Sequence, residues 1–352
     1  MNKLKFLFIF ILCFAVYAEQ IPIPPLYPTS TPSARIKGLG GAGTALYPDA
    51  SAPYWNPAML GGLEAAAITL TFAEEDSSSF AQILEREPSV LGKHISFFSL
   101  VTYQGGFTYH PLYMISYRDS FSDSLGFERD FELKLDEYIF TVTTFTGSDS
   151  KYDSPFLLGF NVKYLNGRFI ETRLYKDSDT SAVTDGDGDI AYGNGYGLDG
   201  GIAFKVSRFT LGIMARDILT HVYWGGYDRQ TIPMYTSLGI SLNPIPSLII
   251  CADVNRIFKS ELPFFYRAGL EYSYMREISD SSFLANIRGG SPSFRIGTSF
   301  REISQIGFMD IALGAGYSSN MFRVDLGTEG KLNNYLYGGF TYQLSLTLPF
   351  KI

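Results

Sequence analysis

The sequence has few of the residues on which many exported proteins and enzymes depend. It contains two cysteines, three histidines and two tryptophans among 352 residues. Cys13 lies in an N-terminal segment that we expect to be removed, so Cys251 is left alone and no intramolecular disulfide can form. An exported chain of this length must then be stabilised by a large hydrogen-bonded framework instead of disulfides.

Long apolar runs are also absent after residue 18. No later stretch approaches the length of a transmembrane helix, which needs about 20 apolar residues, so the sequence predicts no helical membrane spans. One shorter apolar run, 6–17, follows Lys3 and Lys5 and is followed by the small residue Ala18. This order is typical of a secretory signal, so we interpret residues 1–18 as a signal peptide.

Basic residues are scarce relative to acidic ones. Without Lys3 and Lys5, the chain has 26 Lys and Arg against 35 Asp and Glu, which argues against nucleic-acid binding. Aromatic residues and glycine are abundant, with 24 Tyr, 29 Phe and 35 Gly, yet the mean hydropathy is only +0.05. A membrane β-barrel has such an average because lipid-facing and lumen-facing residues alternate along each strand.

Apolar and polar residues do alternate along much of the chain, and the last segment shows it most clearly. One face of that strand would carry Tyr342, Leu344, Leu346, Leu348 and Phe350, and the other Thr341, Gln343, Ser345 and Thr347. The pattern recurs at 156–164, 202–206, 209–216, 266–274 and 309–317. A soluble β-sandwich would alternate too, but its apolar faces favour Val, Ile and Leu. Here they often end in Tyr or Phe, which is typical of the aromatic girdles of a transmembrane antiparallel β-barrel.

Strand-like runs between 65 and 350 number about 14 to 16. Because bacterial barrels favour even strand numbers, we predict about 14 strands over residues 65–352. Short connections at Val206–Arg208 and Asn243–Pro246 are expected at the periplasmic end. The longer polar segments 119–130, 174–194 and 219–232 are expected to be surface loops.

Residues 19–64 lack this alternation. Pro22, Pro24, Pro25, Pro28 and Pro32 give an extended lead-in that cannot be a central strand. A glycine-rich and small-residue stretch follows, too polar to face lipid and too apolar to extend into water. We therefore predict that residues 19–64 are an N-terminal extension and a plug inside the barrel lumen.

The glycines of this segment match a nucleotide-binding pattern on paper. Residues 38–43 fit G-x-G-x-x-G, but the dinucleotide motif needs a strand before it and a helix after it, and prolines flank it instead. We expect no nucleotide and no other cofactor. Gly40, Gly41 and Gly43 are expected to let the backbone pack closely against the barrel wall.

The remaining motifs for metal binding or catalysis are weak. Asp185, Asp187 and Asp189 resemble the start of a calcium loop, but Ile190 and Tyr196 stand where an EF-hand needs Gly and Glu. We favour a solvated acidic turn, with a weak calcium site as the alternative.

Catalysis has no support in the sequence. His94, His110 and His221 have no evident nucleophile, so we predict that the protein is not an enzyme. Pro111 removes a ladder hydrogen bond from the third expected strand, which indicates either a kink in the wall or a simple strand end.

The N-terminal block resembles a known family. The segments SAR at 33–35, GLGGAGTAL at 38–46, DASA at 49–52 and YWNPAML at 54–60 are similar to the N-terminal signature of FadL-like outer-membrane proteins, including the PorV-type branch. Residues 195–201 and 211–218 continue the likeness more loosely. The resemblance implies a bacterial outer-membrane location, a 14-stranded barrel and a plug. It also implies transport of hydrophobic small molecules such as long-chain fatty acids, which leave through a lateral gap.

The resemblance also points to individual residues and partners. The Asn-Pro-Ala element of the family's plug corresponds to Asn56, Pro57 and Ala58, and the kink of its third strand to Pro111. Expected partners are outer-membrane lipid, a hydrophobic ligand and the barrel-assembly machinery, which reads the C-terminal strand. The PorV branch instead implies docking or shuttling of secreted proteins, with secretion components as partners. An open porin is a third possibility.

Overall fold

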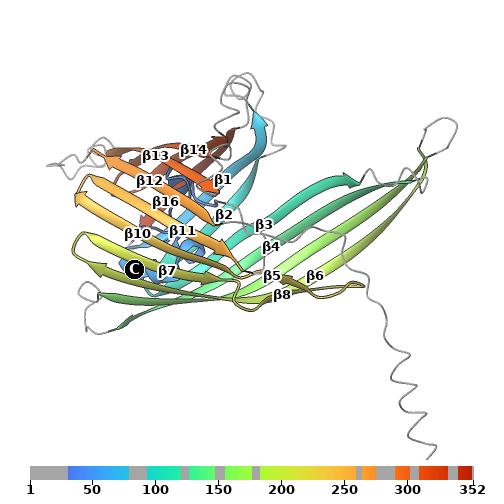
Figure 1. Cartoon of the computed structure of the whole chain (residues 1–352), viewed down its shortest axis with the longest axis horizontal. Helices are drawn as coiled ribbons and strands as arrows, with labels where there is room; N and C mark the ends of the chain where they lie inside the picture. The colour runs from blue at the N-terminus through green and yellow to red at the C-terminus, as the bar shows by residue number, and fades with distance from the viewer. Residues whose placement is uncertain are drawn as a thin grey trace, which may run out of the picture.

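Most of the described chain is β-strand in the computed structural model (Figure 1). The structure describes residues 31–78, 93–119, 127–146, 155–176, 183–258, 264–274, 290–301, 309–331 and 340–350. The predicted signal peptide 1–18 and the lead-in to residue 30 lie outside this range.

The strands are β1 Ala66–Ser78, β2 Lys93–Thr102, β3 Gly105–Asp119, β4 Phe127–Thr146, β5 Phe156–Lys176, β6 Val183–Val206, β7 Phe209–Arg216, β8 Thr220–Trp224, β9 Gln230–Ile232, β10 Tyr235–Ile245, β11 Leu248–Ile257, β12 Phe265–Ser273, β13 Ser291–Arg301, β14 Asp310–Ser318, β15 Arg323–Lys331 and β16 Phe340–Phe350. Before them come the short helices α2 Ala34–Gly38 and α3 Ala52–Trp55 and the 3-10 helix η1 Pro57–Gly62.

Fourteen of the strands, β1–β7 and β10–β16, close into one antiparallel barrel. Closure occurs where β1 pairs with β16, from Ala66 opposite Phe350 onward, and where β5 pairs with β6. The strand number predicted from the alternation is confirmed. Short turns at Ser207–Arg208 and Pro246–Ser247 lie at one end of the barrel, because β7 and β10 pair with Phe209 opposite Leu242. We call this the inner end and the opposite end the outer end, since barrels of this kind put their short turns on the periplasmic side.

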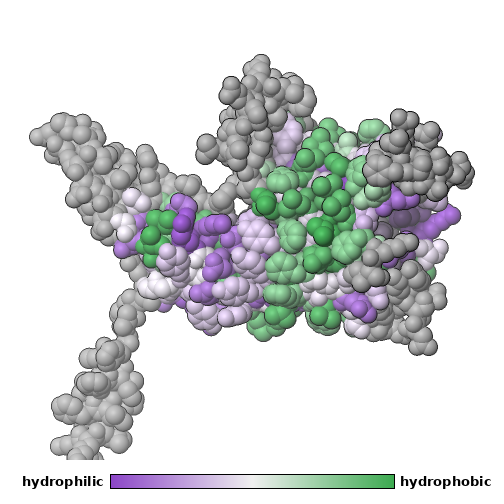
Figure 2. Space-filling model, turned by 180° about the vertical axis from the view of Figure 1, so that it is seen from behind, coloured by the Kyte–Doolittle hydropathy of each residue, from purple (hydrophilic) through white to green (hydrophobic). Residues whose placement is uncertain are grey.

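The outward faces of the strands form an apolar belt. It includes Phe140, Val142, Phe160, Val162, Leu238, Ile240, Phe294, Ile296, Leu344 and Leu346, all exposed. Figure 2 shows such side chains as a green band with hydrophilic surface on either side. A contiguous apolar surface of this extent is stable only against lipid, so the chain is a membrane barrel, and bacterial barrels of this type belong to the outer membrane.

Among the described residues, no helix is long and apolar enough to cross a membrane.

Two expected surface loops are wrong. Segment 174–194 is mostly strand, because β6 begins at Val183 and pairs with β5 from there to Phe204. Segment 219–232 forms the β8–β9 hairpin, and β8 pairs with β6 at 193–196 beyond the end of β7. Glycine and aspartate have low strand propensity, but a neighbouring strand that supplies a complete ladder of backbone hydrogen bonds outweighs this local preference. Of the third expected loop, 119–130, residues 120–126 lie outside the described residues.

The strands β4, β5 and β6 are 20, 21 and 24 residues long, about twice what a barrel strand needs to cross a membrane. Their outer halves, joined by β8 and β9, continue past the apolar belt, and β3 to β6 run together away from β1 and β2 (Figure 1). We call this part the extension: residues 127–135, 165–176, 183–195 and 220–232.

Candidate functional site

The first part of the candidate site is the N-terminal segment 33–63, which lies inside the barrel. Its residues are buried except near Tyr47 to Asp49, and α2 lies against β13 to β16 while η1 lies against β2, β4, β5 and β6. We call residues 33–63 the lumen segment. Its contacts reach strands around the whole barrel, so it occupies the cross-section of the lumen.

Glycine on the inner wall makes room for the lumen segment. Eight strands present an inward glycine at its level: Gly159, Gly201, Gly212, Gly239, Gly269, Gly297, Gly314 and Gly327. A Cβ on Gly159 would lie 2.3 Å from the amide nitrogen of Ala58, and one on Gly297 would lie 2.2 Å from that of Gly40. No real Cβ approaches another backbone so closely, so these positions accept only glycine while the segment stays docked. We call these eight residues the glycine belt.

Asn56 is the polar centre of the lumen segment. Its side-chain amide donates to the carbonyls of Thr44, at 3.0 Å, and Ile202, at 3.1 Å, and its oxygen accepts from the amide of Ala58 at 3.1 Å. The side chain is fully buried and all three contacts are to backbone groups. Asn56 therefore holds two parts of the segment together and ties both to β6.

Pro57 and Ala58 continue this attachment toward β4 and β5. Pro57 is the first residue of η1, where a proline loses no hydrogen bond, and its carbonyl accepts from the hydroxyl of Thr143 on β4 at 2.9 Å. Ala58 lies against Gly159 of the glycine belt. The three residues singled out by the resemblance thus lie together at the wall; their role in a plug stays a prediction.

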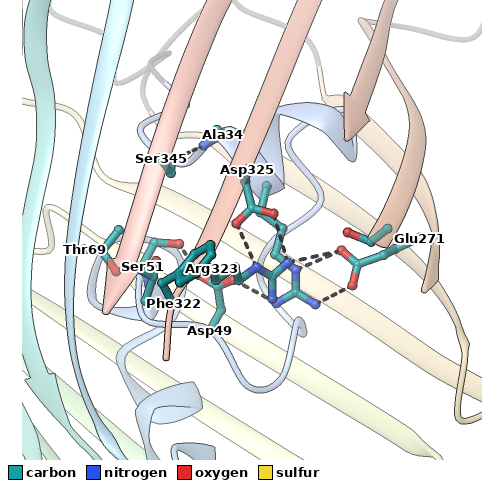
Figure 3. Close-up of polar contacts among 12 residues, drawn as sticks. Ala34, Asp49, Ser51, Thr69, Glu271, Phe322, Arg323, Asp325 and Ser345 are labelled. Carbon is teal, nitrogen blue, oxygen red and sulfur yellow. Dashed lines mark hydrogen bonds and ion pairs between the residues drawn. The ribbon is translucent and has the colours of Figure 1, made fainter. Parts of the chain in front are cut away.

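A second attachment is a network of ion pairs toward the inner end (Figure 3). The guanidinium of Arg35 in α2 pairs with Asp49 and with Glu271 on β12, both at 2.8 Å. Glu271 also pairs with Arg295 on β13, which in turn contacts Asp325 on β15 at 2.8 Å. The network therefore joins the lumen segment to three strands.

The charges of this network set the ionisation of Asp49. Burial raises the pKa of Asp49, but the charges of Arg35 and Arg323 and the hydrogen bond from Ser51 outweigh burial, so that the pKa lies below its ordinary value. The carboxylate is therefore ionised and available to Arg35 across the physiological pH range. The network borders an inner-end cavity of about 400 Å³ between the lumen segment and β1, β15 and β16.

On the outer side, the lumen segment meets a ring of buried polar side chains. His110 on β3 contacts Glu137 on β4 at 3.4 Å, and Glu137 contacts the ammonium of Lys163 on β5 at 3.5 Å. Lys163 pairs with Asp199 on β6, at 2.9 Å, and with Asp217.

Arg216 and Tyr54 complete the circle. Arg216 lies 3.7 Å from Asp217 and stacks on the ring of Tyr54, with 4.0 Å from its guanidinium carbon to the ring centroid. The ring of Tyr54 lies 4.9 Å from that of His110. We call these seven residues, Asp199 included, the charge ring. It links five consecutive strands to the lumen segment.

Asp217 reaches this ring through an uncommon backbone conformation. Its φ of 57° lies in the left-handed region, which Asp tolerates better than most residues. Its amide donates to Asp199 at 2.8 Å, and the next residues leave β7 and continue into β8. The local turn therefore directs the carboxylate inward.

Directly outside the charge ring, the inner face of the extension is apolar. The cluster contains Leu112, Phe131, Leu133, Leu135, Leu165, Phe169, Ala191, Val222, Trp224 and Ile232, all buried, with Tyr113 and Tyr227 packed against it. Leu135 stands two residues from Glu137, and Leu165 two from Lys163, on the same faces of β4 and β5. We call this the outer apolar cluster. Interiors facing the water of an open pore would be polar here.

The barrel wall opens beside the charge ring and the outer apolar cluster. The ladder between β2 and β3 runs from Thr102 opposite Gly105 to Phe98 opposite Tyr109, and within the described residues it goes no further. Beyond it, among the residues that the structure describes, β2 pairs only with β1, and β3 only with β4. Figure 1 shows the two strands diverging. We call this opening the β2–β3 split.

Each strand is irregular next to the split. The register of β2 shifts between Phe97 and Ile95, and that of β3 between Pro111 and Tyr113, so one extra residue, Leu112, bulges there. Bulges bend strands, and Pro111 cannot donate to the ladder. Leu112 also belongs to the outer apolar cluster, so the cluster reaches the split.

The fold matches a group of solved outer-membrane channels. No family model matches the chain and no curated protein matches it in sequence. In structure it is similar to a FadL homologue of Pseudomonas aeruginosa, with 13% identity, a TM-score of 0.55 and coverage of 92% of this chain and 99% of that one. It is also similar to the Ralstonia pickettii toluene transporter TbuX, with 12% identity, a TM-score of 0.54 and coverage of 94% and 99%. For the Pseudomonas putida toluene transporter TodX the values are 11%, 0.56, 92% and 98%.

The chain has the FadL-like fold.

Other residues predicted from the sequence take different places in this FadL-like barrel. Gly40 and Gly41 have positive φ values of 66° and 82°, and Gly40 lies against the backbone of Thr298, as expected for close packing on the wall. Gly43 instead packs against Trp55 within the lumen segment.

The predicted acidic turn is wrong. Asp185, Asp187 and Asp189 lie in β6, where the extended backbone pairs with β5 and cannot wrap around a cation. Within the described residues, no cluster of His, Cys, Asp and Glu could hold a metal ion.

Sequence reasoning missed the glycine belt and the charge ring. The glycines did occur on the polar faces of predicted strands, which is a signal of close approach by another backbone. The ring gives a weaker signal, because each strand supplies only one or two of its members. His110, considered above only as a catalytic candidate, is one of them.

Proposed function

We propose that this protein carries hydrophobic small molecules through the outer membrane and releases them sideways through the β2–β3 split. The observation that carries the proposal is the contact between the outer apolar cluster and the split, at Leu112. An apolar molecule can be accommodated by the cluster, whereas the buried charges and the lumen segment beneath it oppose straight passage. Lateral release into the membrane avoids both.

The fold supports the same proposal. TodX and TbuX, which share it, are toluene transporters. The proposal for this chain admits long-chain fatty acids as well as neutral hydrocarbons. The lumen segment acts in it as a plug, with Asn56, Pro57 and Ala58 as its attachment.

The test is transfer of a hydrophobic probe into vesicles that contain the purified protein. Deletion of Leu112 removes the extra residue of the β3 bulge, so the β2–β3 ladder can extend, and transfer should fall toward the rate of empty vesicles. Leu112→Ala is the matched control, because it shortens the same side chain and keeps the bulge. It should retain most of the transfer. A wild-type rate equal to that of empty vesicles contradicts the proposal.

Ion conductance separates this function from that of an open porin. A lumen filled by residues 33–63 predicts little steady conductance in planar bilayers, whereas a porin conducts continuously. Docking of secreted proteins, assembly by the barrel machinery and the absence of enzymatic activity stay predictions from the sequence.

A further inference from the structure

We infer that Tyr113 and Arg216 form a subsite for the uncharged polar group of an otherwise hydrophobic ligand, such as a ketone or ester carbonyl. The inference rests on the proposed function and names the ligand class within it. It predicts that this barrel prefers neutral molecules with one hydrogen-bond acceptor to fatty-acid anions of the same length.

Two N–H donors of the Arg216 guanidinium are unsatisfied among the described residues. Its side chain is only 3% exposed, yet Nε and Nη2 have no hydrogen-bond partner among the described residues. Stacking on Tyr54 fixes the guanidinium, and Asp217 lies beside it at 3.7 Å, beyond hydrogen-bonding distance. Arg35 shows the alternative: its nitrogens donate to Glu271, Asp49 and the carbonyl of Pro48. A buried guanidinium with open donors is costly unless something else accepts from it.

Tyr113 adds a second open donor in the same neighbourhood. Its hydroxyl is buried and has no hydrogen-bond partner among the described residues. Tyr113 lies opposite Leu135 on β4, two residues from Glu137 of the charge ring. The body of the side chain packs on the outer apolar cluster, so the hydroxyl marks the boundary between that cluster and the charge ring.

This boundary suits a molecule with an apolar body and one polar end. The outer apolar cluster would surround the body, while the hydroxyl of Tyr113 and the guanidinium of Arg216 donate to the polar end. Tyr113 is also the residue that follows the extra residue of the β3 bulge, so the subsite adjoins the β2–β3 split.

The charge ring decides against an anionic end. Its cations are Lys163 and Arg216, its acids are Glu137, Asp199 and Asp217, and His110 is counted as uncharged. With all three acids ionised, the ring carries a net negative charge, and with one of them protonated it is neutral. In neither state is a positive charge left over for a ligand carboxylate. A carbonyl accepts the same hydrogen bonds without adding a negative charge to a buried site.

Three twelve-carbon ligands test the inference: dodecane, 2-dodecanone and dodecanoate, the last at a pH where it is ionised. Brominated forms allow binding to be measured as quenching of tryptophan fluorescence. Trp55 and Trp224 are the only tryptophans of the chain, and both adjoin the subsite or the outer apolar cluster. We expect the ketone to bind more tightly than the carboxylate, because it adds no negative charge to the buried site.

Two substitutions separate the hydrogen bond from the charge. Tyr113→Phe should weaken ketone binding about tenfold and leave dodecane binding unchanged, and it removes no hydrogen bond of the described structure. Asp217→Asn should strengthen carboxylate binding, because it removes one negative charge from the ring. Tyr164→Phe is the matched control: its hydroxyl bonds to Asn194 on the outer surface, so ligand binding should not change.

The outcomes are distinguishable. Tighter binding of the carboxylate than of the ketone overturns the inference, and so does an unchanged ketone affinity in Tyr113→Phe, while dodecane binding and transfer would leave the proposed function standing. If none of the three ligands binds or is transferred, the proposed function fails and the subsite with it.

Discussion

Replacement of Asn56 by alanine should release the lumen segment from the wall. The substitution removes three hydrogen bonds in a fully buried place. At about 1 kcal/mol for each lost hydrogen bond, the docked state loses about 3 kcal/mol. The population of the undocked state then rises about a hundredfold.

Cys251 offers a direct assay for this release. It is the only cysteine outside the predicted signal peptide, it is buried, and it packs in a cluster with Ile36, Leu39 and Trp55 of the lumen segment. A thiol reagent can reach it only when the segment moves away. The labelling rate should therefore rise with the undocked population, about a hundredfold in Asn56→Ala, and brief conducting events should appear in planar bilayers.

The matched control is Asn194→Ala, which removes an asparagine that is exposed on β6 and bonded to side chains of the outer surface. It should label like the wild type. An Asn56→Ala protein that labels at the wild-type rate, with its barrel intact by circular dichroism, would refute the reasoning that these three bonds hold the segment in the lumen.

Two further predictions concern the same segment. Gly159→Ala places a Cβ against Ala58 and should raise Cys251 labelling, whereas Gly188→Ala, whose nearest neighbour would be 3.5 Å away, should not; equal rates would contradict the glycine belt. The folded protein holds the pKa of Asp49 below the ordinary value of an aspartate. The ion pair with Arg35 is therefore complete at any pH above the ordinary pKa, and it is lost as the pH falls through the lowered pKa of the folded state. Acid should therefore accelerate labelling in the wild type, less so in Asp49→Asn, and an identical acid response in both would argue against this pair.

The sequence predicted the barrel well because period-two alternation is a local property. Along 342–350 every second residue is apolar, and such a strand can bury that face only against lipid or a core. The strand number followed from the same pattern.

Strand ends were predicted less well. Residues 183–194 carry glycine and aspartate, which locally favour turns, yet they form a strand because β5 supplies a complete ladder. Sequence alone does not show that a partner strand extends so far.

The candidate site was likewise predicted only in part from the sequence. The small-residue composition of 33–63 and its resemblance to a family indicated a segment for the lumen, and Asn56 stood out within it. The tertiary structure alone decided what surrounds it. His110, Glu137 and Lys163 come from three neighbouring strands and Asp217 from the turn after β7, and only the pairing of these strands brings the four within ion-pair distance. The same arrangement leaves Tyr113 and Arg216 with donors that have no partner among the described residues, because a ring of side chains from many strands cannot satisfy every polar group it buries.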